Sequence, residues 1–166
     1  MIDRGQRHNG HDFESIIGLH GVESKCFYWA VKLLHYGTET DIIFGFVKKD
    51  IDPVNFNAPI LENRSFIGLI PGSGRTISNR QPRNYVLEPC PFGMELGLLL
   101  MQAKDDKKKG SLLLFREGQF VDYIEENSIA PGVYYPVASL QNSGHEVRFT
   151  AVPNPAKLII PSTRER

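Results

Sequence analysis

The sequence predicts an all-β fold, and three observations lead to that prediction. Fifteen glycines and eleven prolines interrupt the chain at short intervals, so few gaps could hold a long helix. The segments between these breakers are rich in Phe, Tyr, Ile, Val and Leu, which favour strands. None of them shows a sustained apolar repeat of about 3.6 residues, the pattern of an amphipathic helix. Short apolar segments separated by turn residues are typical of a sandwich or a barrel.

Nine segments carry the strand pattern. They span residues 13–19, 26–36, 41–47, 65–70, 95–103, 111–116, 119–124, 134–140 and 146–152. In the second segment both alternating sets of side chains are apolar, so we expect a strand that is covered on both faces. Gly45 and Gly68 interrupt two of the segments, which indicates a bulge or the close approach of another backbone. Six large aromatic side chains are the expected core: Trp29, Phe44, Phe46, Phe66, Phe115 and Phe149.

The connections between these segments also have recognisable signals. Residues 104–110 form a charged stretch that ends in glycine, so we expect a solvated hairpin loop there. A second turn is expected at Glu117 and Gly118, because glycine adopts a positive φ without steric cost. The prolines after residue 152 predict a C-terminal tail, residues 153–166, behind one domain formed by residues 1–152.

Composition disfavours several classes of partner and compartment. Nineteen Lys and Arg balance nineteen Asp and Glu, so the basic excess expected of a nucleic-acid-binding protein is missing. No apolar run approaches the roughly 18 residues that a membrane helix needs, and the N-terminus has no apolar signal-peptide core. We therefore expect a cytoplasmic or nuclear protein, with Cys26 and Cys90 as reduced thiols.

Five segments carry a recognisable set of motifs. They are Gly21 to Val31, Ile43 to Val47, Ser65 to Leu69, Phe115 to Gln119 and Tyr134 to Leu140. In order and spacing they resemble motifs of the SPRY domain family, including its Tyr-Trp-Glu-Val strand, its Phe-x-Asn-Gly-Lys hairpin and its Leu-Tyr-Pro-Ala-Val strand. The chain departs from that pattern, since Ala30 replaces the usual Glu, Phe66 a Trp, Glu117 an Asn and Met94 an Asp. The resemblance is that of a divergent member.

The resemblance implies a bent antiparallel sandwich of two β-sheets whose function lies in the loops at one end. It implies recognition of a short peptide or protein surface by a monomer without a cofactor, as an adaptor or as the substrate-recognition part of a larger complex. The family's contact loops fall on nine residues of this chain: Arg7, His8, Thr40, Asn55, Phe56, Asn57, Gln141, Asn142 and Ser143.

Catalytic and metal-binding patterns are weak in this sequence. The segment from Gly72 to Thr76 lacks the spacing of a phosphate-binding loop, so we expect a surface turn. His8 and His11 have no third ligand at a spacing that suits zinc. Cys90 has no imidazole or cation nearby in the sequence that could activate a thiolate. We therefore expect neither an enzyme nor a metalloprotein.

Two other functions remain open. A β-sandwich can also be a carbohydrate-binding protein or a hydrolase, because fold does not decide function. Convergent carboxylates in a cleft would favour that alternative. The third alternative is an RNA-binding variant of the resembled family, which needs a local basic patch from Arg75, Arg80 and Arg83.

Overall fold

The computed structural model describes residues 2–4, 13–18, 26–35, 42–48, 65–71, 74–78, 81–85, 93–103, 105, 107–141 and 146–153. Side chains are described for 26–32, 42–48, 65–71, 74–78, 93–103, 105, 107–139 and 148. All regular elements in these ranges are strands, which confirms the predicted all-β class.

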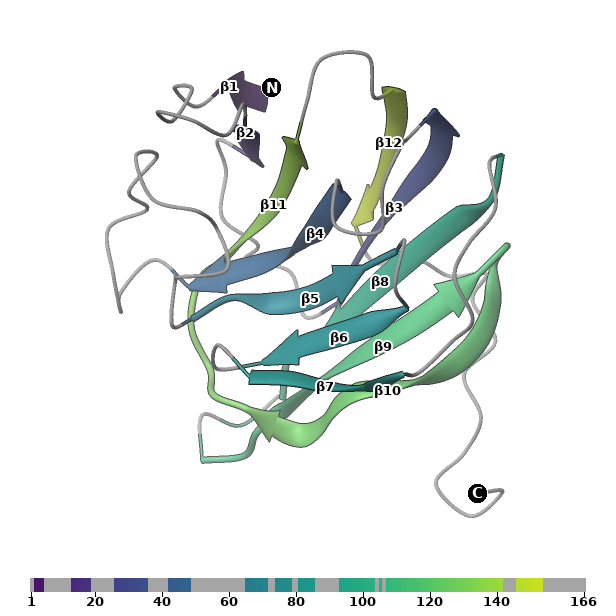
Figure 1. Ribbon diagram of the computed structural model, residues 1–166. Coiled ribbons are helices and arrows are strands. Elements are labelled where there is room, and N and C mark those ends of the chain that lie inside the picture. Colours follow the sequence, from purple (N-terminus) through teal and green to yellow (C-terminus); the bar gives the residue numbers. More distant parts are fainter. Residues whose placement is uncertain are drawn as a thin grey trace.

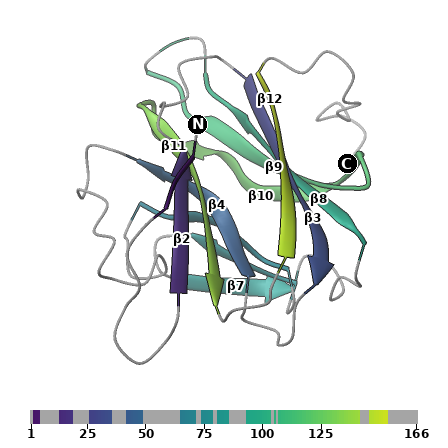
Figure 2. The ribbon, with the colours of Figure 1, turned by 90° about the horizontal axis from the view of Figure 1, so that it is seen from above.

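The strands form two antiparallel sheets that pack face to face (Figure 1). The seven-stranded sheet has the order β1 (Ile2–Arg4), β2 (Phe13–Gly18), β11 (Tyr134–Gln141), β4 (Ile42–Lys48), β5 (Ile67–Ile70), β6 (Arg75–Ser78) and β7 (Gln81–Tyr85). The five-stranded sheet has the order β10 (Gln119–Ile129), β9 (Gly110–Arg116), β8 (Glu95–Met101), β3 (Cys26–His35) and β12 (Glu146–Pro153). Seen from above, β2 and β11 lie on one side and β3 and β12 on the other (Figure 2). The predicted two-sheet sandwich is thereby confirmed.

Three strands were not predicted from the sequence pattern: β1, β6 and β7. β1 has three residues, of which two are charged, and β7 contains Pro82, which is tolerated because β7 is an edge strand. β6 looks polar, yet Thr76 and Ser78 are only 1% and 4% exposed. Arg75 and Thr76 therefore belong to a strand and not to the expected surface turn, whose Gly72 and Ser73 lie outside the described residues.

Aromatic side chains join the two sheets. Trp29 on β3 packs edge-on against Phe44 and Phe46 on β4, with ring centroids 5.4 and 6.2 Å apart. Phe27 contacts Phe46 in the same way at 6.2 Å. Trp29, Phe44 and Phe46 are thus confirmed as core, while Phe149 lies on β12 with its side chain outside the described set.

The outer face of each sheet is also apolar and buried. Phe66 belongs to such a cluster on the seven-stranded sheet, beside Ile43 and Val137. Phe115 belongs to the corresponding cluster on the five-stranded sheet, beside Tyr28 and Leu113. Phe66 and Phe115 are therefore buried as predicted, but outside the layer between the sheets. β3 is covered on both faces, as its sequence predicted.

The strand registers define two ends of the sandwich. At the first, which we call the Gln141 end, Gln141 pairs with Phe13, and Leu140 pairs with Ile42. At the second, the Met101 end, Met101 pairs with Cys26. The contact between Phe27 and Phe46 places the Met101 end of β3 against the final residues of β4, so the ends of the two sheets coincide.

Candidate functional site

Eight of the nine residues that the resemblance implied as a site lie outside the described residues. They are Arg7, His8, Thr40, Asn55, Phe56, Asn57, Asn142 and Ser143. Gln141 is the last residue of β11, and its backbone pairs with Phe13. The structure therefore locates the strand ends that carry the implied loops, and the site itself stays a prediction.

Three of those loops leave from the Gln141 end. Residues 5–12 precede Phe13, residues 36–41 precede Ile42, and residues 142–145 follow Gln141. Phe13 pairs with Gln141, and Ile42 pairs with the neighbouring Leu140, so these loop boundaries lie on three adjacent strands, β2, β11 and β4. Strand ends that are more than a hundred residues apart in the chain, such as Phe13 and Gln141, therefore meet at one end of the seven-stranded sheet.

The fourth implied loop starts elsewhere. Residues 49–64, which include Asn55, Phe56 and Asn57, join Lys48 to Ser65. The backbone N–H of Lys48 donates to the Ser65 hydroxyl at 3.0 Å, and that hydroxyl donates to the Lys48 carbonyl at 3.3 Å. Lys48 pairs with Tyr134 at the Met101 end. The boundaries of this loop are therefore at the opposite end from those of the other three.

The predicted turn at Glu117 and Gly118 closes the hairpin of β9 and β10 at the Gln141 end. Both residues have a positive φ, 50° and 75°, which matches the two-residue turn favoured in hairpins. The Glu117 carboxylate accepts a hydrogen bond from the N–H of Glu95 at 2.7 Å. Its own N–H donates to the Glu95 carbonyl at 2.9 Å. Glutamate at the position of the family's asparagine therefore ties the turn to the start of β8.

A row of aromatic rings crosses the outer face of the five-stranded sheet. Tyr28 packs edge-on against Phe115, Phe115 against Phe120, and Phe120 against Tyr123, with centroids 5.5 to 5.9 Å apart. The Tyr28 ring lies against the backbone of Gly97, where a Cβ would collide with it. Burial raises the pKa of Tyr28 to about 12, and the negative charges of Glu95 and Glu117 add to the effect. Tyr28 therefore keeps its phenol proton to a higher pH in the folded protein than in the unfolded chain.

The described part of the chain has neither a metal-binding cluster nor a membrane-spanning helix. No three His, Cys, Asp or Glu side chains within it gather at a spacing that could hold a metal ion. Nor does it contain a helix that could cross a membrane. His8, His11 and Cys90 lie outside the described residues.

The basic patch considered for RNA binding is only partly visible. Arg75 is exposed on β6, and Arg83 lies on β7, the neighbouring edge strand. The side chain of Arg83 and the whole of Arg80 fall outside the described set. The described residues therefore place one exposed arginine at this sheet edge.

The solved structures with this architecture identify the fold. The SPRY domain of human HERC1 superposes with a TM-score of 0.62 at 14% identity, over 82% of this chain and 81% of that one. A second human SPRY domain gives a TM-score of 0.67 at 15% identity, over 85% and 86% of the two chains. This chain has the SPRY fold. The resemblance inferred from its motifs is confirmed at the level of structure.

The remaining comparisons show similarity in structure but not in sequence. The structure of stonustoxin gives a TM-score of 0.53 at 16% identity, and the match covers 91% of this chain but 28% of the toxin chain. No family model and no curated protein sequence matches the chain. The SPRY fold is thus carried here by a sequence that is only 14 to 15% identical to those two SPRY domains.

Proposed function

We propose that this SPRY-fold chain is a protein-interaction module that recognises a short peptide or protein surface without catalysing a reaction. The observation that carries the proposal is the meeting of three loop boundaries, before Phe13, before Ile42 and after Gln141, on adjacent strands. Loops held by a rigid scaffold can vary in sequence without disturbing the core, and binding sites concentrate there. The proposed contacts at this end are Arg7, His8, Thr40, Gln141, Asn142 and Ser143.

The scaffold beneath these loops is suited to that role. Phe44 is fully buried and Trp29 is 6% exposed, so β3 and β4 are held against each other by close aromatic packing. A preformed surface loses less conformational entropy on binding than a flexible one. We further propose that the long loop after Lys48 reaches along the sandwich and adds Asn55, Phe56 and Asn57 to these contacts. An adaptor role in a larger complex is the setting we propose.

A selection with a defined probe tests this function. The probe is a library of random dodecapeptides displayed on phage, which we would select against the whole chain. We expect a consensus peptide whose binding is lost in Arg7→Ala and Asn142→Ala and kept in Lys107→Ala, an exposed hairpin residue. Failure to enrich any consensus, or a consensus that both loop variants bind as well as the wild type, would contradict the proposal. Salt-sensitive binding of a single-stranded RNA oligonucleotide would favour the RNA alternative instead.

A further inference from the structure

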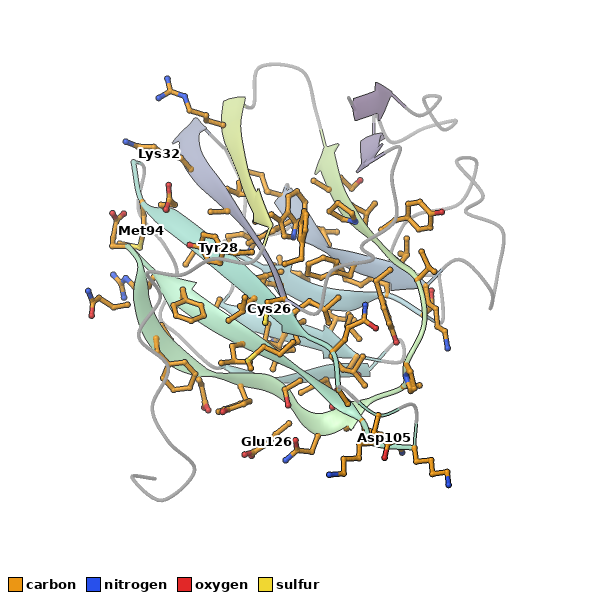
Figure 3. The ribbon with its side chains drawn as sticks, turned by 180° about the vertical axis from the view of Figure 1, so that it is seen from behind. Cys26, Tyr28, Lys32, Met94, Asp105 and Glu126 are labelled. Carbon is orange, nitrogen blue, oxygen red and sulfur yellow. The ribbon has the colours of Figure 1, made fainter. Side chains whose placement is uncertain are left out.

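A hollow of about 380 Å³ lies at the Met101 end, away from the proposed loop surface. Part of its wall is Met101, the last residue of β8, with Gln102 and Ala103 after it, and part is the hairpin with Lys108 and Lys109. Tyr123, Glu126 and Asn127 of β10 form the facing wall. In Figure 3, Glu126 and Asp105 lie along one edge of the sandwich, below Cys26. The volume is within the range of ligand pockets, which begins at about 300 Å³.

An irregularity in β10 builds the facing wall. Glu125 pairs with Leu112 and Ile129 pairs with Gly110, so three residues of β10 lie opposite the single residue Ser111 of β9. This stretch, Glu126 to Ser128, has two residues more than β9 supplies opposite it, and all three of its side chains are exposed. β-Bulges of this kind often lie beside functional sites, where they redirect side chains.

Hydrogen bonds fix the shape of this bulge. Asn127 has a φ of 50°, a left-handed conformation that is uncommon outside glycine. Its N–H donates to the Ser111 hydroxyl at 2.9 Å, and that hydroxyl donates back to the Asn127 side-chain oxygen at 3.5 Å. The Ser128 hydroxyl donates to the carboxylate of the buried Glu125. Hydrogen bonds therefore hold this wall in shape, and Asn127, the residue with the left-handed backbone, lines the hollow.

The opposite wall is equally well defined. The N–H of Lys107 donates to the Asp105 carboxylate at 3.0 Å, and the N–H of Lys108 donates to the Asp105 carbonyl at 2.9 Å. These bonds close the hairpin turn and leave Lys108 and Lys109 exposed at the hollow. The lining of the hollow therefore includes two lysines, Lys108 and Lys109, and one acidic residue, Glu126.

The hollow also has an apolar part, although Gln102 is among its lining residues. Met101 and Tyr123 are half-buried and continue the apolar cluster on the outer face of the five-stranded sheet. Ala103 extends this apolar surface toward the hairpin. A ligand that fits would carry one carboxylate for the lysines and an apolar group for Met101 and Tyr123. A second carboxylate would meet Glu126, which repels it.

We propose that this hollow, the bulge pocket, binds a partner-protein segment in which a single acidic residue stands next to an apolar one. Recognition is through side chains, because the bulge disrupts the free edge of β10 and discourages the pairing of an added strand. The bulge pocket lies at the opposite end of the sandwich from the proposed loop surface. It would give this chain a second, independent contact with its partners.

Titration with small peptides, followed by ¹⁵N NMR of the whole chain, tests the bulge pocket. The probe is acetyl-Glu-Leu-amide, and its controls are acetyl-Gln-Leu-amide and acetyl-Glu-Ser-amide. We expect the probe to shift the amide signals of Ser111 and Asn127 with a Kd on the order of 1 mM, as befits so small a ligand. Each control should bind at least fivefold more weakly. Equal binding of all three peptides, or no shift at Ser111 and Asn127, would overturn the proposal.

Substitutions of charged residues test which side chains of the bulge pocket contact the carboxylate of the probe. Lys108→Glu combined with Lys109→Glu should weaken the probe at least fivefold, whereas Lys107→Glu, on the same hairpin but outside the hollow, should change its affinity less than twofold. Glu126→Gln should raise the affinity for acetyl-Glu-Glu-Leu-amide by at least twofold. Unchanged signals elsewhere verify that each variant is folded. Equal effects of the Lys107 and Lys108/Lys109 changes would contradict the site. Tighter binding of 4-methylpentanoate than of the dipeptide would overturn the assignment to a protein segment.

Discussion

Gly45 and Gly68 lie directly opposite each other on β4 and β5, and neither position has room for a side chain. A Cβ on Gly45 would lie 2.7 Å from the Cα of Gly68, and a Cβ on Gly68 would lie 2.8 Å from the Cα of Gly45. Both values are below ordinary van der Waals separation. The prediction of a close backbone approach at these glycines is confirmed. The backbone of each glycine occupies the space that a Cβ on the other would need.

Gly45→Ala should therefore destabilise the fold strongly. The added methyl group meets backbone atoms, which cannot rotate away, so we expect a loss of about 2 kcal/mol or more in the free energy of unfolding, near the upper part of the range for overpacking. Urea denaturation measures it. Gly93→Ala is the control, because Gly93 has open space around it and a φ of 79°. Its cost should be about 1 to 2 kcal/mol from the backbone alone. A Gly45→Ala variant as stable as the wild type would contradict the close approach.

Trp29→Ala should remove the centre of the layer between the sheets. Trp29 contacts both Phe44 and Phe46, and truncation of a buried aromatic residue leaves a cavity. We expect a loss of about 3 to 5 kcal/mol in the free energy of unfolding, and a smaller loss for Trp29→Phe. A change below about 1 kcal/mol, typical of surface positions, would be inconsistent with this packing.

Variants of Glu117 separate its two roles in the turn. Glu117→Ala loses the hydrogen bond to Glu95 and keeps a Cβ at positive φ, while Glu117→Gly loses the hydrogen bond but relieves the backbone. We therefore expect the alanine variant to be less stable than the glycine variant by about 1 kcal/mol. Equal stability of the two, measured by denaturation, would show that the turn does not hold residue 117 at positive φ.

The tyrosines predict a loss of stability in alkali. Burial raises the pKa of both Tyr28 and Tyr134 from 10.0 to about 12, and the Tyr134 hydroxyl donates to the Ala130 carbonyl at 2.7 Å. Between these values the unfolded chain releases phenol protons that the folded chain retains. Their contribution to stability is therefore complete below pH 10 and is lost as the pH rises through 12.

Denaturation at several pH values checks this effect. Tyr28→Phe combined with Tyr134→Phe should show a smaller fall in unfolding free energy between pH 10 and 12 than the wild type. The difference in slope isolates the tyrosines, because lysines titrate over the same range in both proteins. Parallel pH profiles for the two proteins would mean that neither phenol has a raised pKa in the folded protein.

The sequence predicted those features of the fold that depend on local pattern. Alternating apolar residues mark β3, whose Trp29 and Tyr28 face opposite clusters, and glycine marks the turn after Glu117. β6 was missed because Thr76 and Ser78 are buried polar residues, and burial of this kind is set by neighbouring strands rather than by the residues' own hydrophobicity. Strands are therefore predicted best where the buried residues are also the apolar ones.

The sites were less predictable than the fold. The bulge pocket depends on Asn127 standing opposite Ser111, and this follows from the register of β10, which the sequence does not display. Loop contacts transferred from a resemblance also depend on where each loop begins. The boundaries at Lys48 and Ser65 show how a segment that aligns with a contact loop can start at the other end of the sandwich.

The most direct test of the interaction proposal is the affinity of a selected consensus peptide for loop variants, measured by isothermal titration. Arg7→Ala, Phe56→Ala and Asn142→Ala should each weaken binding by about 1 kcal/mol or more, roughly fivefold, because a few central aromatic, arginine and neighbouring contacts carry most binding energy. The free energy of unfolding should stay nearly unchanged, and Lys107→Ala should bind like the wild type. Wild-type affinity in all three loop variants would contradict recognition through these loops.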